Sequence, residues 1–155
     1  DAVVGLVGDV ELAAKDRGGT ILASTLDAPH LIANVLVVRG EFAARYPDAV
    51  RRVIRGILDA GASISRDPGA GARLLSEVAP YLGAPYEAIK AAPPATLKDN
   101  LSFFGLSGEA PVTYDELFKS ASELAIKIGQ ASEPIDAEDT RDLGPLKYVS
   151  QARGP

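Results

Sequence analysis

The sequence of 155 residues contains no cysteine, no methionine and no tryptophan, and it has a single histidine. The absence of cysteine excludes disulfide bonds, thiolate metal sites and cysteine nucleophiles. No apolar run approaches the ~20 residues that a membrane-spanning helix needs, and no signal peptide is recognisable. We therefore expect no direct insertion into a membrane.

The absence of methionine also bears on the origin of the chain. A reading frame begins with methionine, and processing removes only the first one. The chain starts at Asp1 and enters an apolar run, residues 2–7, at once, whereas natural chain starts are usually polar and frayed. We expect a processed or truncated piece of a longer protein; the alternative is a mature protein that begins on a strand.

Charge is weakly negative, at −5, and no block of lysine and arginine occurs. Nucleic acids and anionic membranes are bound through clustered positive charge, so neither is an expected partner. The content of 46% hydrophobic and 24% charged residues is ordinary for a globular protein. A folded domain with its own core is therefore expected.

The first quarter of the chain has the pattern of an α/β fold. Apolar runs at residues 2–7, 20–24 and 32–39 predict strands, and residues 10–16 between the first two predict a short helix. Strand, helix and strand at such short spacing indicate a parallel βαβ unit. Two or three strands cannot cover their own edges, so the sequence predicts half of a larger α/β protein.

Everything after Gly40 has the pattern of helices. Asp67 followed by Pro68 marks a helix start, and Thr113 with Glu116 forms a capping box before another helix. Residues 136–142 predict a last short helical turn. The expected inward-facing residues are Val50, Val53, Ile54, Ile57, Leu58, Leu74, Leu75, Val78, Leu117, Ala121, Leu124 and Ile128.

Small and polar residues follow the first two predicted strands. These are Gly8 and Asp9 after the first, and Ser24, Thr25 and Asp27 after the second. Ligands of open α/β sheets bind at the carboxyl ends of strands, so all five are candidate ligand-binding residues. The same residue types also form tight turns and helix caps, which is the alternative for each.

No catalytic, metal or cofactor site is predicted. His30 has no nucleophile or second metal ligand at a recognisable spacing, and the carboxylates show no acid–base pair. The glycines around Leu6 lack the full spacing of a nucleotide-binding loop. Phe103 and Phe104 are expected to pack in the core.

Several stretches of the chain together resemble the nitrate/sulfonate/taurine type of ABC solute-binding proteins, in particular a branch described as phosphate-type. The stretches are DAVVG at residues 1–5, DAPHLIANVLVVR at 27–39, EFAARYPDAV at 41–50 and KDNLSFFG at 98–105. The resemblance spans nearly the whole chain and is most specific over residues 27–57.

The resemblance implies the C-terminal half of a bilobed type 2 periplasmic binding fold. Residues 1–26 would end the second lobe and residues 27–39 would cross the hinge. Residues 40–150 would supply helices of the first lobe, and residues 151–155 a flexible tail. The five candidate residues would face the cleft between the lobes. This chain lacks the aromatic residue and proline that often follow the family's first strand, and no arginine lies near the candidates, which disfavours a simple anion as the solute.

The implied function is capture of a small solute by hinge closure in the periplasm, with delivery to an ABC transporter permease. The missing N-terminal half of the same protein would be a further partner. Two alternatives stay open. One is an α/β catalytic domain that binds a nucleotide or sugar phosphate, and the other is a cell-envelope interaction or sensory module without transport.

Overall fold

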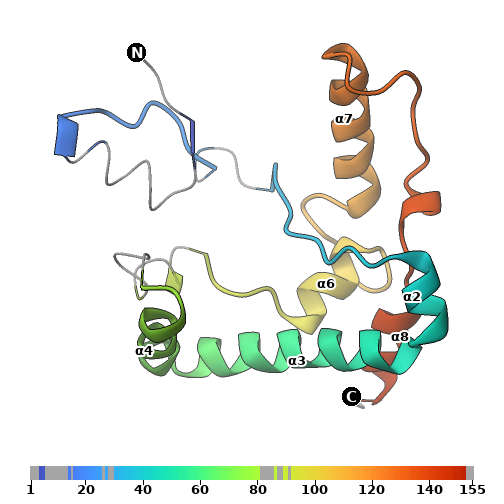
Figure 1. Cartoon of the computed structure of the whole chain (residues 1–155), viewed down its shortest axis with the longest axis horizontal. Helices are drawn as coiled ribbons and strands as arrows, with labels where there is room; N and C mark the ends of the chain where they lie inside the picture. Colours follow the sequence, from blue (N-terminus) through green and yellow to red (C-terminus); the bar gives the residue numbers. More distant parts are fainter. Residues whose placement is uncertain are drawn as a thin grey trace. The chain divides into compact units, whose positions relative to one another are not determined.

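The computed structural model of the chain describes residues 4–5, 14, 16–25, 27, 30–80, 86, 89–90 and 92–152 (Figure 1). The chain divides into two compact units. Unit 1 comprises Asp1–Pro29 and Ala62–Pro94, and unit 2 comprises His30–Gly61 and Ala95–Pro155. The unit boundary near residue 61 falls inside a helix, so one helix contributes residues to both units.

The described residues are helical wherever they are regular, and none of them belongs to a β-strand. The prediction of an α/β fold is therefore wrong, and so is the type 2 periplasmic binding fold that depended on its strands. Residues 20–24 and 32–39, both predicted as strands, have no regular secondary structure. Of residues 2–7 only Val4 and Gly5 are described, and neither lies in a strand; the others are outside the described residues.

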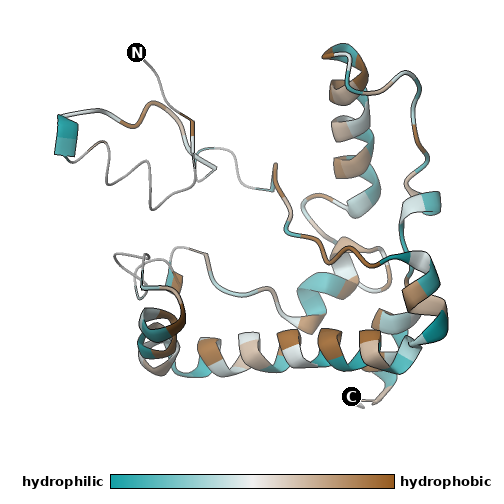
Figure 2. Ribbon diagram, viewed as in Figure 1, coloured by the Kyte–Doolittle hydropathy of each residue, from teal (hydrophilic) through white to brown (hydrophobic). Residues whose placement is uncertain are grey.

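The run at residues 32–39 shows why the strand prediction failed. An apolar run indicates a segment that gains from burial, but a strand forms only where a neighbouring strand takes up its backbone hydrogen bonds. The described residues supply no such neighbour. Ile32 and Val37 remain 75% and 84% exposed. Figure 2 shows this run as a hydrophobic segment that leads directly into helix α2.

The first helix of unit 2 is α2 (Gly40–Arg45), and helix α3 (Pro47–Arg66) follows it closely. The predicted amphipathic pattern of α3 is confirmed, and Figure 2 shows hydrophobic and polar residues alternating along it. Only Val50 and Leu58 of its predicted inner face are buried, however, while Val53 and Ile57 are about half exposed. The helix prediction was right, and the extent of burial was overestimated.

The core of unit 2 depends on a helix that the sequence pattern did not reveal, α8 (Gly144–Ala152). Its Leu146 and Val149 are three residues apart and so share one face. Both are buried, and Val149 is 0% exposed. Gln151 and Ala152, predicted to begin a flexible tail, belong to this helix, while residues 153–155 lie outside the described residues.

Two further helices of unit 2 begin at capping boxes. Helix α7 (Tyr114–Lys127) starts after Thr113 as predicted, and Gly129 follows its end with a φ of 75°. Helix α6 (Leu97–Phe103) starts after Thr96 and was not predicted. The 3-10 helix η1 (Glu138–Thr140) matches the short turn expected at residues 136–142. Ala121, Leu124 and Ile128 were expected to be buried but are exposed.

Unit 1 is described mainly through helix α4 (Pro68–Val78). Asp67 caps it as predicted, with one carboxylate oxygen accepting from the Ala70 amide at 2.9 Å. The buried residues of α4 are Gly71 and Ala72, whereas the predicted Leu74 and Val78 are exposed. A Cβ at Gly71 would lie 3.1 Å from the Ile64 side chain, so glycine permits a close approach of α4 to the end of α3.

The sequence predicts two further short helices in unit 1, one at residues 10–16 and one at residues 85–92, where Pro93 and Pro94 end the helical pattern. Ala14, Asp16 and Arg17 are helical, and Gly18 follows with a φ of 68°, in agreement with a helix that ends at the glycine pair. Tyr86, Ile89 and Lys90 are helical within the predicted stretch 85–92. Ala92, the last residue of the second stretch, is described and lies in a bend outside the helix, and the other residues of both predicted helices are outside the described residues.

Candidate functional site

Two of the five predicted ligand-binding residues meet in one local turn. The backbone amide of Ser24 donates to Asp27 Oδ2 at 2.7 Å, and the Ser24 hydroxyl donates to the same oxygen at 3.2 Å. The Asp27 amide donates back to the Ser24 carbonyl oxygen at 3.1 Å. Thr25 lies within this turn and is exposed. Gly8 and Asp9 are outside the described residues.

This geometry accounts for Ser24 and Asp27 as turn residues, which was the stated alternative. The Asp27 side chain is exposed in this turn, and its carboxylate and the Ser24 hydroxyl are groups of the kind that bind solutes through hydrogen bonds. The role of the three described candidates in ligand binding therefore stays a prediction. His30 is exposed and has a φ of 69°, a conformation that histidine adopts more readily than most residues.

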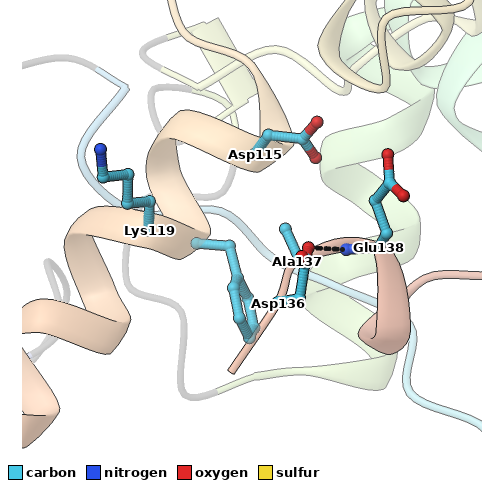
Figure 3. Close-up of a pocket in the computed structure, with 6 residues that line it drawn as sticks. Asp115, Lys119, Asp136, Ala137 and Glu138 are labelled. Carbon is cyan, nitrogen blue, oxygen red and sulfur yellow. Dashed lines mark hydrogen bonds between the residues drawn. The ribbon is translucent and has the colours of Figure 1, made fainter. Parts of the chain in front are cut away.

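An open hollow of about 450 Å³ lies on unit 2 between α7 and η1 (Figure 3). Its lining residues are Asp115, Phe118, Lys119, Asp136, Ala137 and Glu138. In Figure 3 the Lys119 side chain extends away from the carboxylates of Asp115 and Glu138. The Glu138 amide donates to Asp136 Oδ1 at 3.0 Å, which fixes the turn that forms one wall. We refer to this hollow as the acidic hollow.

Arg141 compensates much of the negative charge around the acidic hollow. Its guanidinium pairs with Asp115 and lies 3.8 Å from Glu138 Oε1. The side chain is only 15% exposed and sits near the Tyr114 ring, 5.9 Å from its centre. Through these ion pairs Arg141 links η1 to the start of α7. The acidic hollow is therefore explained by internal ion pairing and does not by itself indicate a cation site.

Four aromatic side chains support the acidic hollow from α6 and α7. Tyr114 stacks on Phe118 with ring centres 5.6 Å apart and contacts Phe104 at 5.2 Å. Phe103 completes the group, 6.1 Å from Tyr114. The Tyr114 hydroxyl hydrogen-bonds Thr140 Oγ1 at 2.8 Å. Phe103 and Phe104 therefore pack against other aromatic rings, but not in the buried core where they were expected, because none of the four side chains is fully buried.

No metal-binding group is found among the side chains that the structure describes: no three histidine, aspartate or glutamate residues come close enough to hold an ion.

A second hollow, on α3 and α8, is lined by three arginines. The sequence pattern puts Arg51, Arg52 and Arg55 on the face of α3 opposite its apolar residues, and it does not connect them to Tyr148. The only signal for this hollow in the sequence was the occurrence of three arginines within about one turn of an amphipathic helix.

The two capping boxes of unit 2 carry the perturbed carboxylates. Hydrogen bonds from the Thr113 backbone amide and hydroxyl, at 2.8 and 2.9 Å, lower the pKa of Glu116. The amide and hydroxyl of Thr96 lower the pKa of Asp99 in the same way. In each case the hydrogen bonds favour the charged carboxylate. These groups stabilise the starts of α7 and α6, which carry the aromatic cluster.

We expect the replacement Thr113→Ala to destabilise unit 2 by about 1 kcal/mol at neutral pH, the usual cost of losing an N-cap side chain. The lowered pKa of Glu116 also predicts a pH dependence. Its stabilising effect is present above the ordinary glutamate value of about 4.3 and is lost as the pH falls through the lowered value. Thermal unfolding followed by circular dichroism between neutral and acidic pH measures both effects.

The matched control is Thr113→Ser, which keeps a capping hydroxyl and should retain both the stability and its acid dependence. If the stability of the double variant Thr113→Ala/Glu116→Gln fell with acid as much as that of the wild type, the capping box would not be the source of the pH dependence.

Comparisons with protein-family models, with curated protein sequences and with solved structures find no match to this chain. Among the helices that the structure describes, none combines the length and the apolar character needed to cross a membrane.

Proposed function

We propose that the chain is part of the solute-binding component of an ABC importer and contributes to capture of a small solute in the periplasm. The observation that supports this most is the division of the chain. One boundary between the two compact units falls at Pro29/His30, within the stretch 27–39 that the resemblance assigns to a hinge. Capture by hinge closure requires compact bodies joined by short crossings of the chain.

The local backbone around this boundary agrees with a sharp change of chain direction. The turn from Ser24 to Asp27 precedes it, and His30 takes up a positive φ of 69°. Irregular backbone of this kind is the usual location of hinge residues, because they absorb changes in φ and ψ. The helical fold of the described residues changes the scaffold expected for such a protein, but not the requirement for two bodies and a connection.

A thermal-shift screen of the chain, and of the full-length polypeptide that contains it, tests the proposal. The solutes are sulfonates, nitrate, phosphate, amines, amino acids and pyrimidines, with nucleotides and sugar phosphates as the comparison set. A solute that binds only the native state raises its stability by about 2.7 kcal/mol at a hundredfold excess over the dissociation constant. We expect a saturable shift with one solute class; shifts confined to nucleotides or sugar phosphates, or none at all, would refute the proposal.

Two variants separate a ligand role of the Ser24–Asp27 turn from a purely local one. Ser24→Ala and Asp27→Asn should weaken binding of the solute identified in the screen. Asp67→Asn is the matched control, because Asp67 caps α4 in the same unit and asparagine also caps well. Loss of stability without loss of solute affinity in the two variants would remove this turn from the site.

The second candidate function is a non-transport interaction module of the cell envelope. It is favoured by the number of large apolar side chains that stay exposed in unit 2, among them Leu31, Ile32, Val37 and Ile57. Exposed apolar patches of this kind mark sites of protein association. This function would be favoured if no solute raised the melting temperature of the chain and the chain bound stably to an envelope protein.

A further inference from the structure

A basic groove lies on unit 2 where α8 meets the first half of α3. It is an open hollow of about 310 Å³ lined by Asp48, Arg51, Arg52, Arg55, Tyr148 and Val149. Three arginines and one aspartate line it, in a chain whose net charge is −5. The groove shares no residue with the Ser24–Asp27 turn and does not depend on the proposed function.

The groove is built on the buried part of unit 2. Val149, at its base, is 0% exposed, and its neighbour Tyr148 places its ring 4.1 Å from the Arg51 guanidinium carbon. Asp48 Oδ1 accepts a hydrogen bond from Arg51 Nη1 at 2.9 Å. A cation held between an aromatic face and a carboxylate has little rotational freedom left. Arg51 is therefore fixed in position before any ligand arrives.

Several hydrogen-bond donors in the basic groove remain unused by the described residues. Arg51 Nε is buried and has no hydrogen-bond partner. Arg52 donates only its Nε, to the Asp48 carbonyl oxygen at 3.3 Å, and Arg55 makes no ion pair within the part of the chain that the structure describes. Arg52 and Arg55 are exposed, so their remaining guanidinium N–H groups can donate to an anion in the open groove, and charge-assisted hydrogen bonds of this kind are the strong ones.

The spacing of the arginines indicates the size of that ligand. Arg51 and Arg55 are one helical turn apart, a rise of about 6 Å. This span suits one compact group with several acceptor oxygens better than an extended acidic peptide. Arginine binds such groups through two parallel hydrogen bonds. We propose that the basic groove binds a tetrahedral oxyanion group of the phosphate or sulfate type, either free or as part of a lipid headgroup.

Titration of the chain with inorganic phosphate, followed through the NMR signals of the arginine Nε–H groups, tests the proposal. Saturable shifts of the Arg51 Nε–H signal are expected, and Arg52→Gln with Arg55→Gln should weaken binding by about tenfold or more, as loss of a charge-assisted hydrogen bond implies. The matched control is Arg66→Gln with Arg73→Gln, which removes the same charge from exposed positions elsewhere. It should change the affinity less than about twofold.

Vesicles of phosphatidylglycerol, with phosphatidylcholine vesicles as reference, distinguish the two sources of the oxyanion. Binding to phosphatidylglycerol that is lost in the Arg52/Arg55 variant supports a lipid headgroup, and phosphate binding with the same loss supports a free ion. Equal weakening in both double variants would overturn the proposal, because it would reflect general charge. If a glutamate-rich peptide bound the chain while neither phosphate nor vesicles did, the proposal would be overturned in favour of a protein partner.

Discussion

Replacement of Val149 by aspartate is expected to unfold unit 2. Val149 is the one described side chain that is completely buried, and few other large side chains of this unit are buried with it, namely Val50, Leu58 and Leu146. A carboxylate at this position would lose its hydration without gaining a partner, at a cost of several kcal/mol. That cost is comparable to the whole stability of a small domain, typically 5–15 kcal/mol.

Urea denaturation followed by far-UV circular dichroism measures this effect. Val149→Ala should give a partial loss of roughly 1–3 kcal/mol, because it removes two methyl groups and leaves a cavity. Gln151→Asp is the matched control: it adds the same charge to an exposed position of the same helix and should cost less than about 1 kcal/mol. A denaturation midpoint of Val149→Asp close to that of the wild type would show that α8 does not contribute to the core of unit 2.

Substitution of Ile32 and Val37 by lysine is expected to change association strongly and stability little. The two side chains are 75% and 84% exposed, in the run 32–39, which also contains exposed Val35 and Leu36. Exposed substitutions usually change stability by less than about 0.5 kcal/mol. The same run is the largest continuous apolar segment of unit 2 outside its helices, so charges there should prevent docking of another chain or segment.

Sedimentation of the wild type and the Ile32→Lys/Val37→Lys variant over a range of concentrations measures this difference. The wild type is expected to self-associate, and the variant to remain monomeric. Ser107→Lys with Gln130→Lys is the control, because it adds the same charge at exposed polar positions of unit 2. If the control suppressed association as strongly as the double variant, net charge would be responsible and the apolar run would not.

Local signals predicted the helices well. The Thr113–Glu116 capping box, the Asp67–Pro68 helix start and the glycine after α7 all act as short-range chemistry requires. The sequence pattern did not reveal helix α6, although Thr96 and Asp99 form a capping box at its start. Helix α8 was missed, although Asp142 accepts a hydrogen bond from the Gly144 amide at its start at 2.8 Å, Pro145 follows, and its two core residues share one face.

Contacts between distant residues could not be predicted from the sequence. Arg141 joins Asp115, and Arg51 meets Tyr148, through packing that no local pattern encodes. The same limit explains the strand error, because apolarity at residues 32–39 indicates a preference for burial and cannot specify the partner that a strand requires. Of the candidate ligand-binding residues, Ser24 and Asp27 were expected near each other because they are close in sequence, and the structure places them in one turn.

Helix α3 affects how the chain unfolds on heating, because it contributes residues to both units. Its backbone hydrogen bonds run without interruption from residues of unit 2, such as Leu58, to residues of unit 1, such as Ile64. Helix formation is cooperative, since each turn supports the next. Melting of either unit should therefore fray the part of α3 that belongs to the other unit, so we expect heat to unfold both units in one coupled transition.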